Sequence, residues 1–186
     1  ILVYSVTPFL SDEASSVDEE GLCRNIRYLV GRGIRIIVPC GGTGEFSALE
    51  LEEHQQVVGA VRAAAGGEIL VIPGVGGSLR QAVRQARNAE SVGCEAVMIF
   101  PPPGRISDMG LVAYVQAVAD QTSIGIMPHL SAPVPLSSLE VLMHTPRVVA
   151  IKDATGDLAW FRRAIRTVGT RVNWLCEGES LAPYYL

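Results

Sequence analysis

The sequence predicts an α/β protein built around a parallel sheet, and three observations support that fold class. The 186 residues are 48% apolar, which is enough for a domain with a sizeable core. Short apolar runs rich in valine and isoleucine recur along the chain without period-two alternation, as expected of strands buried on both faces. Helical patterns separate these runs at intervals of roughly 25 to 35 residues, as in right-handed βαβ units.

Seven apolar runs are expected to form strands. They cover residues 1–6, 34–40, 68–75, 95–100, 124–128, 147–152 and 171–176. Between them, apolar side chains at helical spacing predict helices. Four helices are expected in this way, around Leu22–Val30, His54–Val61, Ala82–Ala89 and Leu111–Val118. The glycine of "VGC" after Ser91 should end the third of these helices.

Two architectures fit this order of elements, the doubly wound open sheet and the (β/α)8 barrel. A doubly wound nucleotide-binding protein carries G-x-G-x-x-G after its first strand. Here the first run is followed by "TPFLSD", and the "PGVGG" after the third run has a different spacing. The barrel is therefore favoured, as a single domain over residues 1–186 with about seven of its eight strands.

A barrel with seven strands leaves two strand edges unpaired. We therefore expect the chain to lack its last strand and C-terminal helices. The expected gap lies between a strand at Leu2–Tyr4 and one at Val172–Trp174. A strand from residues outside the sequence should fill it, or else a strand from a partner chain.

Composition excludes some classes of partner. The formal net charge of −4 and the pI near 5.4 give no electrostatic reason to expect binding to nucleic acid or a membrane surface. The apolar runs are too short to span a bilayer. The four cysteines form no C-x-x-C pair, and we interpret them as buried reduced thiols of a cytoplasmic protein rather than as disulfides or metal ligands.

Residues at the carboxyl ends of barrel strands face the active site, and few of those residues here can perform chemistry. They are Thr7, Thr43, Glu45, His129, Lys152 and Glu177. Lys152 is the only lysine in the chain and follows the apolar run "VVAI". A desolvated lysine can lose its proton and attack a carbonyl, which arginine cannot. The alternative is a strand-ending lysine whose ammonium group reaches water.

A glycine-rich segment, "CGGTGEF" from Cys40, follows the second run. Consecutive glycines around Thr43 allow backbone N–H groups to converge on an anion such as a carboxylate. The alternative is a tight turn into the next helix, in which Ser47 and Glu50 would form a capping box.

Five segments occur in the order and at the intervals of a known family. They are "VTPF" at Val6, "GGTGEFSALELEEH" at Gly41, "PGVG" at Pro73, "FPPP" at Phe100 and "IKDATGD" at Ile151. Together they resemble the dihydrodipicolinate synthase and N-acetylneuraminate lyase family of Schiff-base barrels. The resemblance covers essentially the whole chain.

The resemblance implies a lyase that uses no metal or diffusible cofactor. Lys152 would form an imine with the keto carbon of pyruvate or another 2-oxo acid, and Gly42 and Thr43, with Thr7 nearby, would bind the substrate. The imine then acts as an electron sink, so that C3 can be deprotonated for aldol condensation, cleavage or dehydration. A cytoplasmic homo-oligomer, a dimer or a tetramer, is also implied.

The chain departs from the synthase pattern in ways that affect its activity. The family tyrosine that relays protons is replaced, in the best match, by His129, for which a plain loop residue is the alternative. The segment "PPPGRIS" has no tyrosine, and "SAPVPL" lacks the arginine that synthases use for a second substrate. With Gly42 in place of a hydroxyl residue, "GGTGEF" is more similar to the sugar-acid dehydratases, which act on 5-dehydro-4-deoxyglucarate. A barrel that binds an oxo acid without turnover is the third hypothesis.

Overall fold

A computed structural model describes residues 1–11, 15–169 and 171–185, with the backbone alone at 179 and 180. These residues fall into two compact units. Unit 1 comprises residues 1–75 and 84–97, and unit 2 comprises residues 76–83 and 98–186. The division falls inside helix α3 (Leu79–Ser91) and strand β5 (Ala96–Ile99).

Unit 1 contains a small parallel sheet in the order β1-β2-β3. Its strands are β1 (Val3–Tyr4), β2 (Ile36–Val38) and β3 (Leu70–Val71). Strand β4 (Gly74–Val75) follows β3 after two residues. The run 68–75 therefore forms two short strands rather than the single predicted one. Pro73 lies between them and has no N–H group to donate to a strand ladder.

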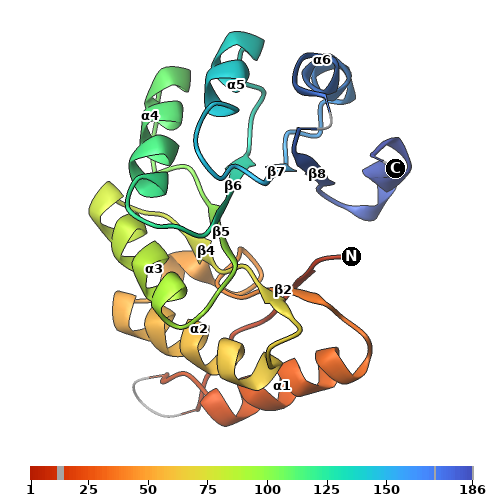
Figure 1. Cartoon of the computed structure of the whole chain (residues 1–186). Coiled ribbons are helices and arrows are strands. Elements are labelled where there is room, and N and C mark those ends of the chain that lie inside the picture. The colour runs from red at the N-terminus through yellow and green to blue at the C-terminus, as the bar shows by residue number, and fades with distance from the viewer. Residues whose placement is uncertain (12–14, 170, 186) are drawn as a thin grey trace. The chain divides into compact units, whose positions relative to one another are not determined.

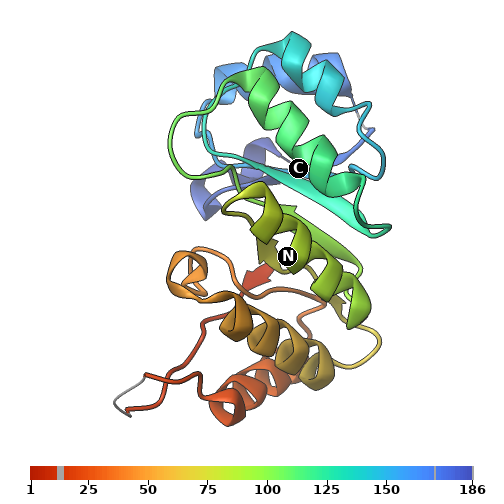
Figure 2. The same cartoon turned by 90° about the vertical axis from the view of Figure 1, so that its left-hand side faces the viewer.

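Helices α1 (Glu19–Gly31) and α2 (Leu51–Ala65) lie side by side in unit 1 (Figures 1 and 2). Both form where apolar periodicity predicts them. Leu22 and Ile26 of α1, like Val57 of α2, are completely buried. These helices supply much of the core of unit 1.

The predicted capping box of Ser47 and Glu50 is wrong. Glu50 is itself the N-cap of α2, and its reciprocal partner is Glu53, whose carboxylate accepts from the Glu50 backbone N–H at 2.8 Å. Ser47 instead belongs to a 3₁₀ turn, η1 (Phe46–Ala48). Glu45 precedes that turn with a left-handed φ of 60°, and the chain therefore completes a turn before the helix begins.

Unit 2 contains the last two residues of β5 and strands β6 (Gly125–Leu130), β7 (Ala150–Asp153) and β8 (Asn173–Cys176), in that spatial order. Strands β6, β7 and β8 are parallel. Figure 1 shows α4 (Asp108–Ala119), α5 (Leu136–Leu142) and α6 (Leu158–Val168) following one another along one side of these strands. A further 3₁₀ segment, η2 (Glu179–Tyr184), follows β8.

Helices α5 and α6 were not among the predicted elements. Helix α5 has only seven residues, too few for a periodic pattern to emerge. Helix α6 does carry an apolar stripe, because Trp160, Phe161, Ala164 and Val168 are all buried. The tryptophan and phenylalanine also pack against Trp174 of β8, with ring centroids 6.2 and 5.5 Å apart. These aromatic contacts hold helix α6 against strand β8.

Strand β1 pairs with β2, and β8 pairs with β7. Among the described residues neither strand has a second strand partner. A further strand, which residues outside the sequence would supply and which would pair with β1 and β8, stays a prediction.

Two of the four cysteines are buried as expected, and two are not. Cys40 and Cys94 lie in the core of unit 1, whereas Cys23 and Cys176 are partly exposed. Burial raises the pKa of the Cys94 thiol to about 12, which makes that side chain an inert packing group.

Candidate active site

Strand β7 delivers Lys152 into the interior of unit 2. All four residues of β7 are buried, and Lys152 is only 5% exposed. Its Nζ donates a hydrogen bond to the backbone carbonyl of Cys176 on β8 at 2.9 Å. Burial lowers the pKa of Lys152, against the opposing effect of Glu177, Cys176 and Asp153. Once it is deprotonated, this buried amine can attack a carbonyl. It is not a strand-ending lysine whose ammonium group reaches water, which was the alternative interpretation.

His129 lies on the strand next to Lys152. The two residues are register partners on β6 and β7, and the Phe100 ring packs against the imidazole with centroids 5.0 Å apart. Burial lowers the pKa of His129, and the charge of Lys152 lowers it further. Its buried Nδ1 has no hydrogen-bond partner among the described residues. A neutral imidazole with a free nitrogen beside the amine can accept or donate a proton.

The residues after Lys152 have structural roles that explain the "DATGD" segment. Asp153 is buried, and its carboxylate accepts from the Thr155 backbone N–H at 2.8 Å and from the Tyr185 hydroxyl at 2.5 Å. Gly156 adopts a left-handed φ of 68°, and Asp157 caps α6 by accepting from the Trp160 backbone N–H at 2.8 Å. A turn and a helix cap thus hold the end of β7 in place.

In unit 1 the glycine-rich segment forms a compact turn. Backbone N–H groups of Glu45 and Phe46 donate to the carbonyls of Gly42 and Gly41, both at 3.1 Å. Gly42 and Thr43 are exposed at the outside of this turn. Thr7 is buried, and its hydroxyl donates to the Gly44 carbonyl at 2.8 Å. Thr7 therefore anchors the turn that presents Gly42 and Thr43.

Replacing Gly44 with alanine should destabilise the protein. A Cβ there would lie 2.9 Å from the Ser5 carbonyl oxygen and 3.0 Å from the Cys40 backbone nitrogen, neither of which can move freely. Overpacking of this kind costs about 1–3 kcal/mol, measurable by chemical denaturation. Gly42→Ala is the matched control, because nothing lies within 4 Å of its Cβ position, and should change stability by less than about 0.5 kcal/mol. Equal stabilities for the two variants would contradict the packing of this turn.

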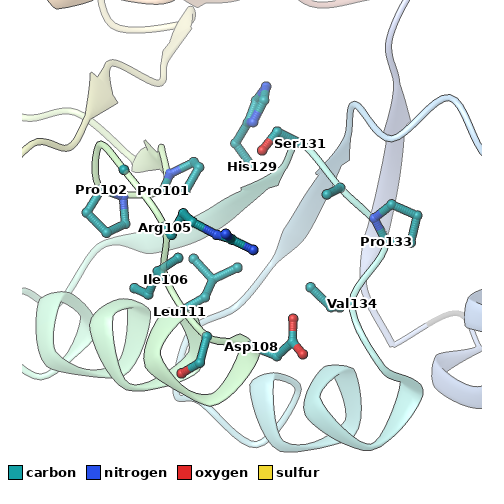
Figure 3. Close-up of a pocket in the computed structure, with 13 residues that line it drawn as sticks. Pro101, Pro102, Arg105, Ile106, Asp108, Leu111, His129, Ser131, Pro133 and Val134 are labelled. Carbon is teal, nitrogen blue, oxygen red and sulfur yellow. The ribbon is translucent and has the colours of Figure 1, made fainter.

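A cavity of about 270 Å³ lies in unit 2 between the segments that follow β5 and β6. Figure 3 shows Arg105 extending across it, with His129 at one edge and Asp108 at the start of α4. Arg105 is not among the strand-end residues that the sequence predicts to perform chemistry. Its position just after a strand end was the available signal.

The two acidic candidates are both exposed. Glu45 is exposed on the turn in unit 1, and Glu177 is exposed after β8, where its charge raises the pKa of Lys152. His54 is buried in unit 1, with Nε2 2.7 Å from the Gly74 carbonyl oxygen, and is a packing residue. Within the described residues no cluster of histidine, cysteine or acidic side chains could hold a metal ion. No helix there is long and apolar enough to cross a membrane.

Comparison with known proteins decides the family. The model of the dihydrodipicolinate synthetase family matches residues 1–186. The chain belongs to this family. The resemblance identified in the sequence is thereby confirmed.

The chain is similar to curated proteins of two kinds. It is 35% identical over 179 residues to a 4-hydroxy-tetrahydrodipicolinate synthase from Methanoculleus marisnigri, with 89% of this chain and 59% of that protein covered. It is 32% identical over 178 residues to a probable 5-dehydro-4-deoxyglucarate dehydratase from Bacillus licheniformis, with 94% and 57% covered. The chain thus spans less than two thirds of the length of either relative.

Solved structures of the family share the fold. A dihydrodipicolinate synthase from Oceanobacillus iheyensis superposes with a TM-score of 0.91 at 30% identity, covering 98% of this chain and 62% of that one. An N-acetylneuraminate lyase from Mycoplasma synoviae gives a TM-score of 0.87 at 21% identity, which bears on the fold alone; it covers 97% of this chain and 62% of that one. The predicted fold class, the (β/α)8 barrel, is therefore confirmed.

Proposed function

We propose that this chain carries the imine-forming lysine of a lyase that acts on a 2-oxo acid. The observation that carries the proposal is Lys152, the only lysine of the sequence, buried at the end of a parallel strand with a lowered pKa. Family membership supports the same assignment.

The proposed reaction begins when the neutral amine of Lys152 attacks the C2 carbonyl of the oxo acid. Water leaves, and a protonated imine forms between Nζ and C2. Loss of a proton from C3 then gives an enamine, which either attacks an aldehyde or expels a hydroxyl group. Hydrolysis of the imine returns the amine and releases the product.

His129 is the proposed proton acceptor at C3. Its lowered pKa keeps the imidazole neutral, and its register pairing places it on the strand beside Lys152. A general base must be unprotonated when the reaction starts, so these features suit the role. The exposed turn at Gly42 and Thr43, anchored by Thr7, is the proposed site for the substrate carboxylate.

Two variants of this function are distinguished by the second half of the reaction. Similarity to a synthase favours condensation with an aldehyde, and similarity to a probable sugar-acid dehydratase favours loss of water. The synthase-type arginine is missing from "SAPVPL", and this absence favours the dehydratase. A barrel that only binds an oxo acid is the remaining candidate, and it would form the imine without C3 proton exchange.

We further propose that residues 1–186 belong to one barrel domain of a cytoplasmic homo-oligomer, a dimer or tetramer. The coverage of 98% of the chain by a single superposed structure supports one domain. Four unpaired cysteines support a reducing compartment. Family membership supports the oligomer.

The test is a panel of 2-oxo acids incubated with the protein and sodium borohydride. Pyruvate and larger oxo acids should become attached irreversibly, because borohydride reduces the imine to a stable secondary amine. Mass spectrometry of the intact protein measures the attachment. No attachment of any oxo acid would contradict the proposed function.

The rate of this trapping should rise with pH and level off below the pH at which free lysine titrates. Only the neutral amine attacks. Because the pKa of Lys152 is lowered, its amine becomes neutral at a lower pH than the amine of an unperturbed lysine, whose pKa is about 10.4. Nα-acetyl-lysine under the same conditions is the control. If the curves of trapping rate against pH have the same midpoint for the protein and for Nα-acetyl-lysine, the lowered pKa is contradicted.

A further inference from the structure

The last two residues of β7 are both hydrogen-bonded to one segment, residues 176–185, which runs from the end of β8 through η2 (Figure 1). Lys152 Nζ donates to the Cys176 carbonyl at 2.9 Å, and the Asp153 carboxylate accepts from the Tyr185 hydroxyl at 2.5 Å. Cys176 is the first residue of this segment and Tyr185 is the last. The two hydrogen bonds therefore attach both ends of segment 176–185 to the end of β7.

The contact between Tyr185 and Asp153 is well supported on both sides. Asp153 is 1% exposed, and its carboxylate also accepts from the Thr155 backbone N–H at 2.8 Å. The Tyr185 ring stacks on Phe161 of α6, with centroids 3.8 Å apart and an interplanar angle of 17°. Burial raises the pKa of Tyr185, and so do the hydrogen bond to Asp153 and its charge. The hydroxyl thus keeps its proton and donates a charge-assisted hydrogen bond, one of the stronger kinds.

The position of the Lys152 amine depends on how segment 176–185 is held. A lysine side chain is flexible, and this one is directed by its hydrogen bond to the Cys176 carbonyl. Strand β8 pairs with β7 and, among the described residues, with no other strand. The pair of Asp153 and Cys176 is the last in the register of β7 and β8, and Glu177 beyond it is exposed. The contact of Tyr185 with Asp153 attaches the chain to β7 again after this point.

Asp153 also affects Lys152 through its charge. The charge of Asp153 raises the pKa of Lys152, as do those of Glu177 and Cys176, and together they oppose the lowering by burial. The Tyr185 hydroxyl holds this carboxylate in place. Tyr185 is therefore connected to Lys152 in two ways, through the Asp153 carboxylate and through the segment that presents the Cys176 carbonyl.

We propose that Tyr185 is a positioning residue for the nucleophile Lys152, acting through Asp153 and segment 176–185. This inference rests on the proposed function and adds to it a residue that does not lie at a strand end. Tyr185 holds the carbonyl that directs the amine and the carboxylate beside it. The amine is then oriented before the oxo acid arrives.

The test measures the rate of borohydride trapping of pyruvate against pH, with both reagents in excess so that imine formation limits the rate. Tyr185→Phe removes the hydroxyl and keeps the ring that stacks on Phe161. On the plateau at high pH the amine of Lys152 is neutral, so the rate depends on its position rather than its charge. We expect Tyr185→Phe to lower the plateau rate about 10- to 100-fold, because a misplacement of about 1 Å can cost a factor of about 10².

Tyr184→Phe is the matched control, because it makes the same change at the preceding residue, whose side chain is 54% exposed. It should leave the plateau rate unchanged. Asp153→Asn removes the charge and keeps the size of the side chain. Its curve of trapping rate against pH should have a midpoint at lower pH than that of wild type, because the charge of Asp153 raises the pKa of Lys152. A contact that only stabilises the fold would not move this midpoint.

Three results separate this inference from the proposed function. If pyruvate is trapped but Tyr185→Phe has the plateau rate of wild type, or both tyrosine variants are slowed equally, the inference is overturned while the proposed function stands. An unchanged midpoint in Asp153→Asn also overturns the inference. If the wild-type protein traps no oxo acid at all, the proposed function fails first.

Discussion

Replacing Lys152 with alanine should abolish the borohydride-dependent attachment of pyruvate and reduce turnover to the uncatalysed level. Lys152 is the only lysine in the sequence, and its amine is buried at the end of β7. Without it no side chain of the sequence can form an imine. Loss of a covalent nucleophile can lower kcat by up to about 10⁶-fold. Intact-protein mass spectrometry and a turnover assay measure the two effects.

Lys152→Arg is the matched control for charge. Arginine keeps the positive charge but stays protonated, so it should fail as completely as alanine. Circular dichroism should show that both variants remain folded. Attachment that persists in either variant at the wild-type level would refute the assignment of Lys152.

Replacing His129 with alanine should leave the attachment of pyruvate intact but slow exchange of its C3 protons. The imidazole lies on the strand beside Lys152, and its buried Nδ1 is unpaired among the described residues. A positioned general base contributes about 10²- to 10⁴-fold, so we expect C3 exchange, followed by NMR in deuterated water, to slow by that factor.

His144→Ala is the control for this experiment, because His144 is exposed after α5 and its Nδ1 lies 2.8 Å from the Glu140 carbonyl oxygen. The His144→Ala variant should catalyse exchange of the C3 protons of pyruvate at the wild-type rate. Exchange unaffected by His129→Ala would make His129 a loop residue. If the wild-type protein forms the imine but exchanges the C3 protons of pyruvate only at the background rate, the oxo-acid-binding barrel is favoured over the lyase.

The strands were predictable because each buried strand is a short apolar run. Periodicity located helices α1 to α4, but α6 was not predicted although it carries an apolar stripe. Periodicity was insufficient for α5, which is one short helix after Pro135. The capping box was misassigned because Ser47 has a favourable residue type, whereas the actual box begins at Glu50. Such details depend on where the chain turns, which the left-handed conformation of Glu45 determines.

Within the candidate site, Lys152 could be predicted because a lysine that follows a buried strand is unusual. Its neighbours could be predicted only in part. The contact of Tyr185 with Asp153 joins residues far apart in sequence. Tyr185 also stacks on Phe161 with ring centroids 3.8 Å apart. Arg105 lines a cavity that two segments enclose, and in the sequence only its position after a strand end points to it.

The measurement that tests the central claim most directly is the location of the reduced pyruvate adduct. After borohydride treatment of the wild-type protein, tandem mass spectrometry of its peptides should find one carboxyethyl group, on the Nζ of Lys152. The amino terminus can also react, and it should remain unmodified at low pyruvate concentration. An adduct found at the amino terminus, with Lys152 unmodified at saturating pyruvate, would contradict the account.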